Sequence, residues 1–297
     1  MRLEIRSYRG LAVAFLVLVG TMTGVTAEAG GDSLDVQGHR GWRGQYPENT
    51  MAAFRAALEL RVTTLELDVQ VTRDGVPVVH HDAKLNRSLC VRDGGRPVEG
   101  QRIAEVDFAS LADIDCGSRP NGRFPEQRRV QGERIPRLDQ VLELALKADY
   151  PVRLSVEIKM QGSHSEGAAA ELAGIIVETI RAHGLEERTI VQSYQSEALS
   201  AVADLAPELD RAILVRSPSA YDREVERARA TILSPRHDGL TRAAVERFQQ
   251  RGIAVIPWTV NKPSAIEKMI SWGVDGIITD YPERVLEILG RSEEDSP

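Results

Sequence analysis

Short apolar runs alternate with longer amphipathic segments along most of the chain, from residue 35 to residue 289. This alternation is typical of repeated strand–helix units around a parallel sheet. The apolar runs predict nine strands, at residues 34–39, 63–71, 76–81, 153–159, 189–193, 212–215, 231–235, 254–260 and 276–280. Nine strands are one more than a (β/α)₈ barrel contains.

The third of these strands is the extra one. The four residues TRDG separate strand 63–71 from strand 76–81, whereas neighbouring parallel strands need a crossover of a dozen or more residues. We therefore expect an antiparallel hairpin that turns at Asp74 and Gly75. The other eight strands predict an α/β fold, a (β/α)₈ TIM barrel with a β-hairpin extension. The hairpin would return His81 to the barrel rim.

Three further segments depart from the alternation. Residues 83–134 are rich in glycine, proline and charge, which predicts an inserted segment after the second barrel strand. Residues 1–29 contain three arginines, an apolar run and small residues at their end, the pattern of a secretory signal peptide. The apolar run has about ten residues, fewer than the ~20 that cross a bilayer. Residues 291–297 are polar and acidic and predict a disordered tail, so the barrel domain should occupy residues 30–290.

Charge and cysteine content narrow the class of protein. The net charge is −7, and loss of residues 1–27, with three arginines and one glutamate, would change it to −9. An acidic exported protein is a poor nucleic-acid binder, and an anionic substrate would need local positive groups or a metal ion. We expect a protein of the periplasm or the medium, with no stable membrane anchor after cleavage. In that compartment Cys90 and Cys116 favour a disulfide, with two buried thiols as the alternative.

Three carboxylates are predicted to converge at the barrel rim. Glu66 and Asp68 share one face of the strand LELDV, and Glu157 and Lys159 share one face of LSVEIK, because side chains alternate along a strand. If the apolar residues pack on the helices, the carboxylates point inward near the C-terminal strand ends, where such barrels place their active sites. Oxygen ligands suit one divalent cation, Mg²⁺ or Ca²⁺. The alternative for any single carboxylate is neutralisation by a basic side chain.

Histidines and an arginine lie at the predicted strand ends. His39 and Arg40 close the first strand, and His81 ends the hairpin with His80 on its opposite face. A planar guanidinium suits two phosphate oxygens. Two histidines provide one group to accept a proton and one to donate it, as phosphodiester cleavage requires. Glu48 could orient Arg40 or a substrate hydroxyl, or stabilise the first turn of a helix.

Six motifs in the same order resemble the glycerophosphodiester phosphodiesterase family: GHRGWRGQYPENTMAAF, LELDVQVTRDGVPVVHHD, SVEIK, IVQSY, IPWTVN and DGIITDYPE. The resemblance covers nearly all of residues 35–289 and implies a metal-dependent barrel enzyme that hydrolyses small glycerophosphodiesters to glycerol 3-phosphate and an alcohol. It implies Glu66, Asp68 and Glu157 as metal ligands, His39 and His81 as the acid–base pair, Arg40 and Lys159 as phosphate-holding groups, and Trp258 as part of the pocket wall. Glu48 is a further candidate for substrate binding, on the grounds given above. Tyr194 stands where the family usually has phenylalanine, which leaves the alcohol group open.

Other functions are compatible with parts of this pattern. A lysophospholipase-D-like or sphingomyelinase-D-like enzyme would need an apolar entrance on residues 83–134, yet this segment is polar. A glycoside hydrolase needs two carboxylates on either side of the bond to be cleaved, whereas Glu66 and Asp68 lie ~7 Å apart on one strand. A non-catalytic barrel would have no use for two histidines beside three carboxylates. The choice between Mg²⁺ and Ca²⁺, the route of attack and the oligomeric state stay open.

Overall fold

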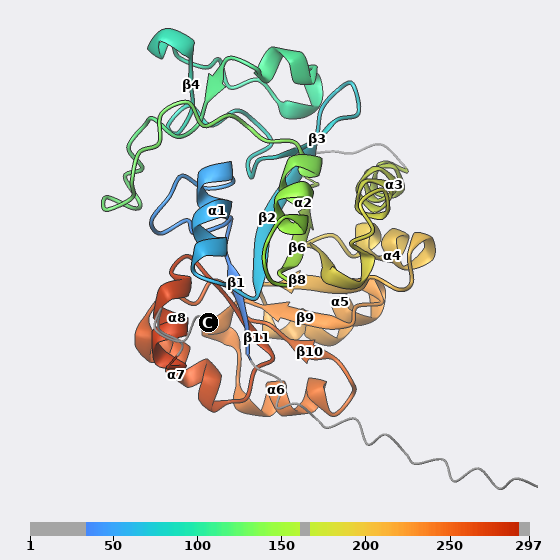
Figure 1. The fold of residues 1–297 in the computed structure, drawn as a ribbon. Coiled ribbons are helices and arrows are strands. Elements are labelled where there is room, and N and C mark those ends of the chain that lie inside the picture. The colour runs from blue at the N-terminus through green and yellow to red at the C-terminus, as the bar shows by residue number, and fades with distance from the viewer. Residues whose placement is uncertain (1–33, 161–166, 291–297) are drawn as a thin grey trace, which may run out of the picture. The chain divides into compact units, whose positions relative to one another are not determined.

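The protein folds as a (β/α)₈ barrel, which confirms the predicted fold class. The computed structural model describes residues 34–160 and 167–290, so the predicted signal peptide at 1–29 and the predicted tail at 291–297 lie outside the described residues. The parallel strands are β1 (Asp35–Gly38), β2 (Thr64–Val71), β6 (Arg153–Ile158), β7 (Thr189–Ser193), β8 (Asp210–Val215), β9 (Ile232–Pro235), β10 (Ala254–Val255) and β11 (Gly276–Thr279). They follow one another around the sheet in the order β10-β9-β8-β7-β6-β2-β1-β11 (Figure 1).

A helix comes after each of these strands in the described part of the chain and packs outside the sheet (Figure 1). The helices are α1 (Met51–Glu59), α2 (Leu138–Leu146), α3 (Ala168–Arg181), α4 (Ser196–Leu205), α5 (Tyr221–Ala228), α6 (Arg242–Gln249), α7 (Pro263–Ser271) and α8 (Pro282–Ile288). The apolar face of β2, with Leu65 and Leu67, is buried with Val141 and Leu142 of α2 in the main core. None of the described helices has the length and apolar character needed to cross a bilayer.

Backbone hydrogen bonds complete the barrel between β10 and β11. Asp275 N donates to Val255 O at 3.0 Å, Ile278 N to Pro257 O at 3.0 Å, and Val260 N to Ile278 O at 2.9 Å. The sequence predicts one strand over 254–260, whereas the regular strand ends at Val255. Pro257 lacks an N–H group and interrupts the regular ladder, although the chain keeps its course along the sheet.

The predicted hairpin is confirmed, with a shorter second strand than expected. Strand β3 (Pro77–Val79) pairs antiparallel to β2, with Val69 opposite Val79. Gly75 in the turn has a φ of 81°, which glycine adopts without steric cost. His80 and His81 lie beyond the strand end, and His80 N donates to Asp68 O at 2.9 Å. The backbone of His80 is therefore held beside Asp68 of β2.

Residues 83–134 form a small layer with its own apolar cluster. Strands β4 (Val91–Arg92) and β5 (Ile114–Asp115) pair in it as a short antiparallel sheet, and in Figure 1 the segment, teal to green, lies beyond the ends of α1 and α2. Its buried apolar residues, with one neighbour from the hairpin and one from the loop before α2, are Val78, Leu85, Cys90, Val98, Ile103, Leu111, Ile114 and Ile135. The expected disulfide is confirmed between Cys90 and Cys116, 26 residues apart in sequence.

Candidate active site

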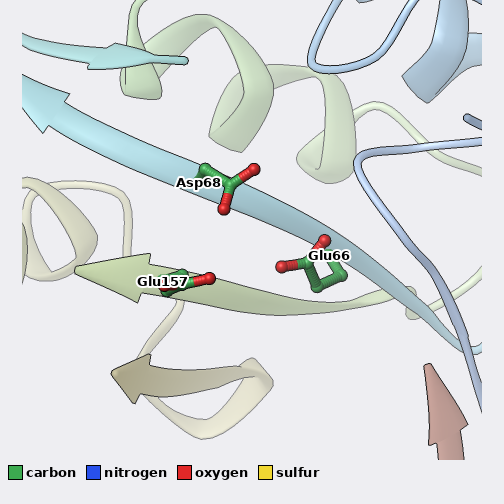
Figure 2. A group of neighbouring side chains, drawn as sticks. All are labelled: Glu66, Asp68 and Glu157. Carbon is green, nitrogen blue, oxygen red and sulfur yellow. The ribbon is translucent and has the colours of Figure 1, made fainter. Parts of the chain in front are cut away.

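The three predicted carboxylates come together at the C-terminal ends of two neighbouring strands. Glu66 and Asp68 lie on β2, and Glu157 lies directly beside Asp68 on the paired strand β6. One oxygen of each carboxylate lies within 4.8 Å of an oxygen of the other two. Figure 2 shows the three groups turned toward one shared space. Their exposed fractions are 1%, 1% and 6%, so water provides little solvation.

The surroundings of these carboxylates differ. Burial and the neighbouring charges of Asp68 and Glu157 raise the pKa of Glu66 well above its ordinary value. Burial would also raise the pKa of Asp68, but Arg40 and Lys159 hold it well below its ordinary value. Burial raises the pKa of Glu157 to about 7, against the opposing effect of Lys159. The positive charges near Glu66 and Glu157 therefore do not offset the burial of these two carboxylates.

A divalent cation fits this set of donors. Three buried carboxylate oxygens from adjacent strands suit a hard ion with oxygen ligands. Asp68 Oδ1 is buried and accepts no hydrogen bond from the described residues, although Lys159 Nζ lies 3.4 Å away. Such an atom has an electron pair left over for a further positive partner. The cluster could thus hold a metal ion.

Polar side chains position Glu66 and Asp68 from outside β2. Gln192 Nε2 at the end of β7 donates to Glu66 Oε1 at 2.7 Å. Asn49 Nδ2 donates to Asp68 Oδ2 at 2.8 Å. Asn49 has a φ of 56°, a left-handed conformation that asparagine tolerates better than most residues. The next residue, Thr50, accepts the hydrogen bond of Ala53 N at 3.2 Å and is the N-cap of α1.

Arg40 is held in an unusual backbone conformation. Its φ is 54°, and its backbone N–H donates to Glu66 Oε2 at 2.8 Å. A Cβ on the neighbouring Gly41 would lie 2.7 Å from the backbone of Ala53 in α1, so the turn needs glycine there. The motif GHRG therefore lets the chain turn tightly against α1 while the Arg40 amide faces Glu66. Strained residues of this kind occur often at functional sites.

The two basic groups predicted to hold phosphate are paired with carboxylates. The Arg40 guanidinium lies 2.6 Å from Glu48 Oε1 and 3.0 Å from Asp68 Oδ2. Lys159 Nζ lies 2.8 Å from Glu157 Oε1. Glu48 also binds Arg43 Nε through its second oxygen at 2.6 Å. Among the roles considered for Glu48, the geometry favours orientation of arginines.

His39, at the end of β1, has a carboxylate partner that the sequence analysis missed. Its Nδ1 lies 2.6 Å from Asp280 Oδ1, and Asn261 Nδ2 donates to Asp280 Oδ2 at 2.7 Å. Burial lowers the pKa of His39, and Asp280 opposes this effect. Burial alone would raise the pKa of Asp280, but His39 and Arg43 hold it well below its ordinary value. Asp280 ends the motif GIITD two residues after Ile278, which lines the cavity, so strand alternation was the available signal in the sequence.

His81 has the same arrangement with a carboxylate of its own. Its Nδ1 lies 2.7 Å from Asp82 Oδ1, and Asn86 Nδ2 donates to Asp82 Oδ2 at 2.8 Å. The hydrogen bond from His81 lowers the pKa of Asp82 to about 2. His81 lines the central cavity, as expected, whereas His80 Nε2 lies 3.3 Å from Lys84 O.

A cavity of about 660 Å³ joins these groups at the barrel mouth. Trp258 is part of its wall, as predicted, and its indole Nε1 donates to Ser234 O at 2.8 Å. The predicted site residues that line it are His39, Arg40, Glu66, His81, Glu157, Lys159 and Trp258, whereas Glu48 lines an adjoining hollow of about 370 Å³. Three arginines in the lining were not singled out from the sequence: Arg43, Arg123 and Arg216.

Comparison with known proteins identifies the family of this chain. Residues 39–284 match the model of the glycerophosphoryl diester phosphodiesterase family. A glycerophosphodiester phosphodiesterase of Caldanaerobacter subterraneus is 33% identical over 252 residues, which cover 84% of this chain and 96% of the relative.

Two solved structures are similar as well. A Silicibacter pomeroyi protein assigned as a glycerophosphoryl diester phosphodiesterase has a TM-score of 0.82 at 33% identity, over 87% of this chain and 94% of its own. An Oleispira antarctica phosphodiesterase in complex with the product sn-glycerol-3-phosphate has a TM-score of 0.72 at 27% identity, over 86% and 96% of the two chains. The chain belongs to the glycerophosphoryl diester phosphodiesterase family and is an enzyme of that family.

Proposed function

We propose that the enzyme hydrolyses glycerophosphodiesters to glycerol 3-phosphate and an alcohol, with one divalent cation, Mg²⁺ or Ca²⁺, held by Glu66, Asp68 and Glu157. The observation that carries the proposal is the cluster of these three buried carboxylates at a cavity that Glu66 and Glu157 line together with two histidines. The Nδ1 atom of each histidine contacts a further carboxylate. When bound, the cation would neutralise phosphate charge and polarise the reacting phosphorus–oxygen bonds. Family membership supports the same reaction class over the glycoside hydrolase alternative.

Arg40 and Lys159 would hold the phosphate. Both side chains line the cavity, and each contacts the carboxylate cluster with its charged group. Glu48 keeps the guanidinium of Arg40 in place with a contact of 2.6 Å, so the planar fork is ordered before substrate arrives. A phosphate near these groups gains charge-assisted hydrogen bonds without reorganising the site. Trp258 would form the wall beside the alcohol group.

His39 and His81 would transfer the protons. Each has its Nδ1 on a carboxylate, which favours the tautomer with the proton on Nδ1 and leaves Nε2 for the substrate. His39 Nε2 lies 4.0 Å from Glu66 Oε2 and therefore faces the carboxylate cluster. One imidazole would accept the proton of the attacking oxygen, and the other would protonate the departing alcohol oxygen. These two transfers are needed whether a glycerol hydroxyl or water attacks first.

A water-soluble diester is favoured over a lipid. The large apolar side chains that are exposed among the described residues, Leu146, Leu205 and Ile288, lie on or at the ends of helices outside residues 83–134. The inserted segment contributes Arg123 to the cavity lining instead. A lysophospholipase-D-like enzyme would need an apolar surface at that entrance to receive an acyl chain.

The test replaces each histidine and compares release of glycerol 3-phosphate from glycerophosphoglycerol. We expect His39→Gln and His81→Gln each to lower kcat by about 10²–10⁴-fold, because each variant loses a proton-transfer group. His183→Gln is the matched control, since His183 contacts Thr179 O at 2.8 Å at the end of α3, outside the cavity lining. Near-normal kcat in either active-site variant would remove that histidine from the mechanism.

The same assay tests the cation. Excess EDTA should abolish activity, and Mg²⁺ or Ca²⁺ should restore it, because the buried carboxylates need a positive partner. Activity that persists in EDTA would contradict the metal assignment. We also propose that residues 1–29 direct export to the periplasm or the medium.

A further inference from the structure

Three side chains form the wall of the cavity away from the carboxylates. Tyr194 follows β7, Arg216 follows β8, and Trp258 follows β10, so all three lie at the strand ends of the active-site rim. The Arg216 Cζ atom lies 4.8 Å from the centre of the Tyr194 ring and 5.3 Å from that of Trp258. The two rings contact each other edge to face, with centres 5.6 Å apart. A guanidinium thus occupies the corner between two aromatic rings.

The positive charge of Arg216 is not neutralised by the described residues. Arg40, Arg43 and Lys159 of the same cavity each have a carboxylate within 4.0 Å. No described carboxylate lies within that distance of Arg216, which is exposed at the cavity mouth. Burial raises the pKa of Tyr194, so the adjacent phenol stays neutral. The charge of Glu157 also raises the pKa of Tyr194, and the charge of Arg216 lowers it. This wall is therefore within electrostatic reach of the carboxylate cluster.

This arrangement has a consequence for the alcohol part of the substrate. A tryptophan and a tyrosine at a cavity wall would otherwise suit a quaternary ammonium group such as choline, through cation–π contacts. Here the guanidinium of Arg216 already lies over a face of each ring. A cationic group at this wall would therefore meet a like charge. An anionic group would instead receive paired hydrogen bonds from a fork that the rings hold in place.

We propose that Arg216 selects the alcohol part of the diester: it binds an anionic group there, a carboxylate or a second phosphate, and disfavours a quaternary ammonium. This inference rests on the proposed function, since it concerns the leaving alcohol of that reaction. The fixed Trp258 indole, bound to Ser234 O, keeps the guanidinium at the wall. Arg216 is a specificity residue here and takes no part in the proton transfers.

The test compares kcat/KM for four diesters of glycerol phosphate that differ in alcohol charge. The alcohols are choline, glycerol, glyceric acid and glycerol phosphate, and the last two distinguish a carboxylate from a second phosphate. For the wild-type enzyme we expect at least one anionic substrate to exceed glycerophosphoglycerol and glycerophosphocholine to be the poorest. Arg216→Gln should lower the ratio of the anionic to the neutral substrate by about 10- to 100-fold, mostly through KM. Arg216→Lys should recover part of that ratio.

Arg236→Gln is the matched control, because Arg236 follows β9 at the same rim but pairs with Asp238 and does not line the cavity. An unchanged substrate ratio in Arg216→Gln, or a wild-type preference for glycerophosphocholine, would overturn the inference. If the wild-type enzyme cleaves none of the four diesters, the proposed function fails and the inference with it. If the wild-type enzyme cleaves all four diesters with no dependence on the charge of the alcohol, the role of Arg216 is contradicted and the proposed function still holds.

Discussion

At the scale of single residues, the site orients each histidine through a carboxylate that is itself held by an amide. His39 contacts Asp280, whose second oxygen accepts a hydrogen bond from Asn261, and His81 has the equivalent pair on its own side of the cavity. The carboxylate determines which imidazole nitrogen carries the proton, and the asparagine prevents the carboxylate from rotating away. In the mechanism that we propose, Asp280 and Asn261 are therefore positioning residues.

We predict that Asp280→Asn lowers kcat by about 10²–10⁴-fold and leaves KM nearly unchanged. An amide NH₂ facing Nδ1 would favour the other tautomer, with the proton on the nitrogen that should face substrate. Steady-state kinetics on glycerophosphoglycerol measure the effect. Asp238→Asn is the control, since Asp238 is an exposed partner of Arg236 at the same rim. A loss expressed mainly in KM would show that Asp280 shapes the binding site instead of orienting His39.

At the scale of elements, the inserted segment is stabilised by polar contacts as well as by its apolar cluster. Asp115 in β5 accepts backbone hydrogen bonds from Gly117 at 2.8 Å, Ser118 at 3.1 Å and Gly132 at 2.9 Å. Gln127 Nε2 donates to the backbone oxygen of Arg43 at 2.7 Å, next to the site. A charged group therefore contributes to the stability of the segment. The segment also contacts the backbone of Arg43, which lines the cavity.

We predict that protonation of Asp115 in acid makes the inserted segment less stable. Burial alone would raise the pKa of Asp115, but the three N–H donors lower it below the ordinary value of about 3.9. Its stabilising contribution is therefore complete above pH ~4 and is lost as the pH falls through the folded-state pKa. Asp115→Asn should lower the free energy of local unfolding at pH 6 by about 2 kcal/mol.

Hydrogen exchange of residues 114–133 at pH 6 and pH 3 measures this effect. Asp107→Asn, at an exposed ion pair with Arg73, is the control and should change little. Equal protection of the wild type and Asp115→Asn at pH 6 would show that the carboxylate is dispensable.

At the scale of the whole molecule, an acidic chain gathers several basic side chains at one cavity. The chain carries −7, yet the cavity is lined by Arg40, Arg43, Arg123, Lys159 and Arg216. An anionic substrate therefore meets basic side chains on an acidic protein, because recognition in a cleft depends on the groups that line it and not on the net charge. The disulfide in the inserted segment agrees with the export that we propose.

We predict that the exported protein begins after Ala27 or Ala29 and contains no free thiol. N-terminal sequencing and a thiol count on denatured, unreduced protein check both points. Cys90→Ser combined with Cys116→Ser should lower the free energy of unfolding by about 3 kcal/mol, since the crosslink restricts a long loop in the unfolded chain. An intact residue 1 in the exported protein, or two free thiols, would contradict this prediction.

The sequence by itself determined the repeating part of the molecule. Periodicities of two along strands and the short TRDG connection were sufficient for the barrel, the hairpin and the inward direction of Glu66, Asp68 and Glu157. These features could be predicted because each depends on residues that are close in sequence, where chain geometry leaves few choices. The fold of residues 83–134 has no such period and was not predictable in detail.

The tertiary structure alone decided which polar groups meet. His39 and Asp280 are 241 positions apart, and Gln192 and Glu66 are 126 apart. Arg216 contacts the rings of Tyr194 and Trp258 because barrel closure brings their strand ends to one rim. Contacts of this kind depend on strand order, stagger and closure, which are properties of the whole sheet and which no local pattern encodes.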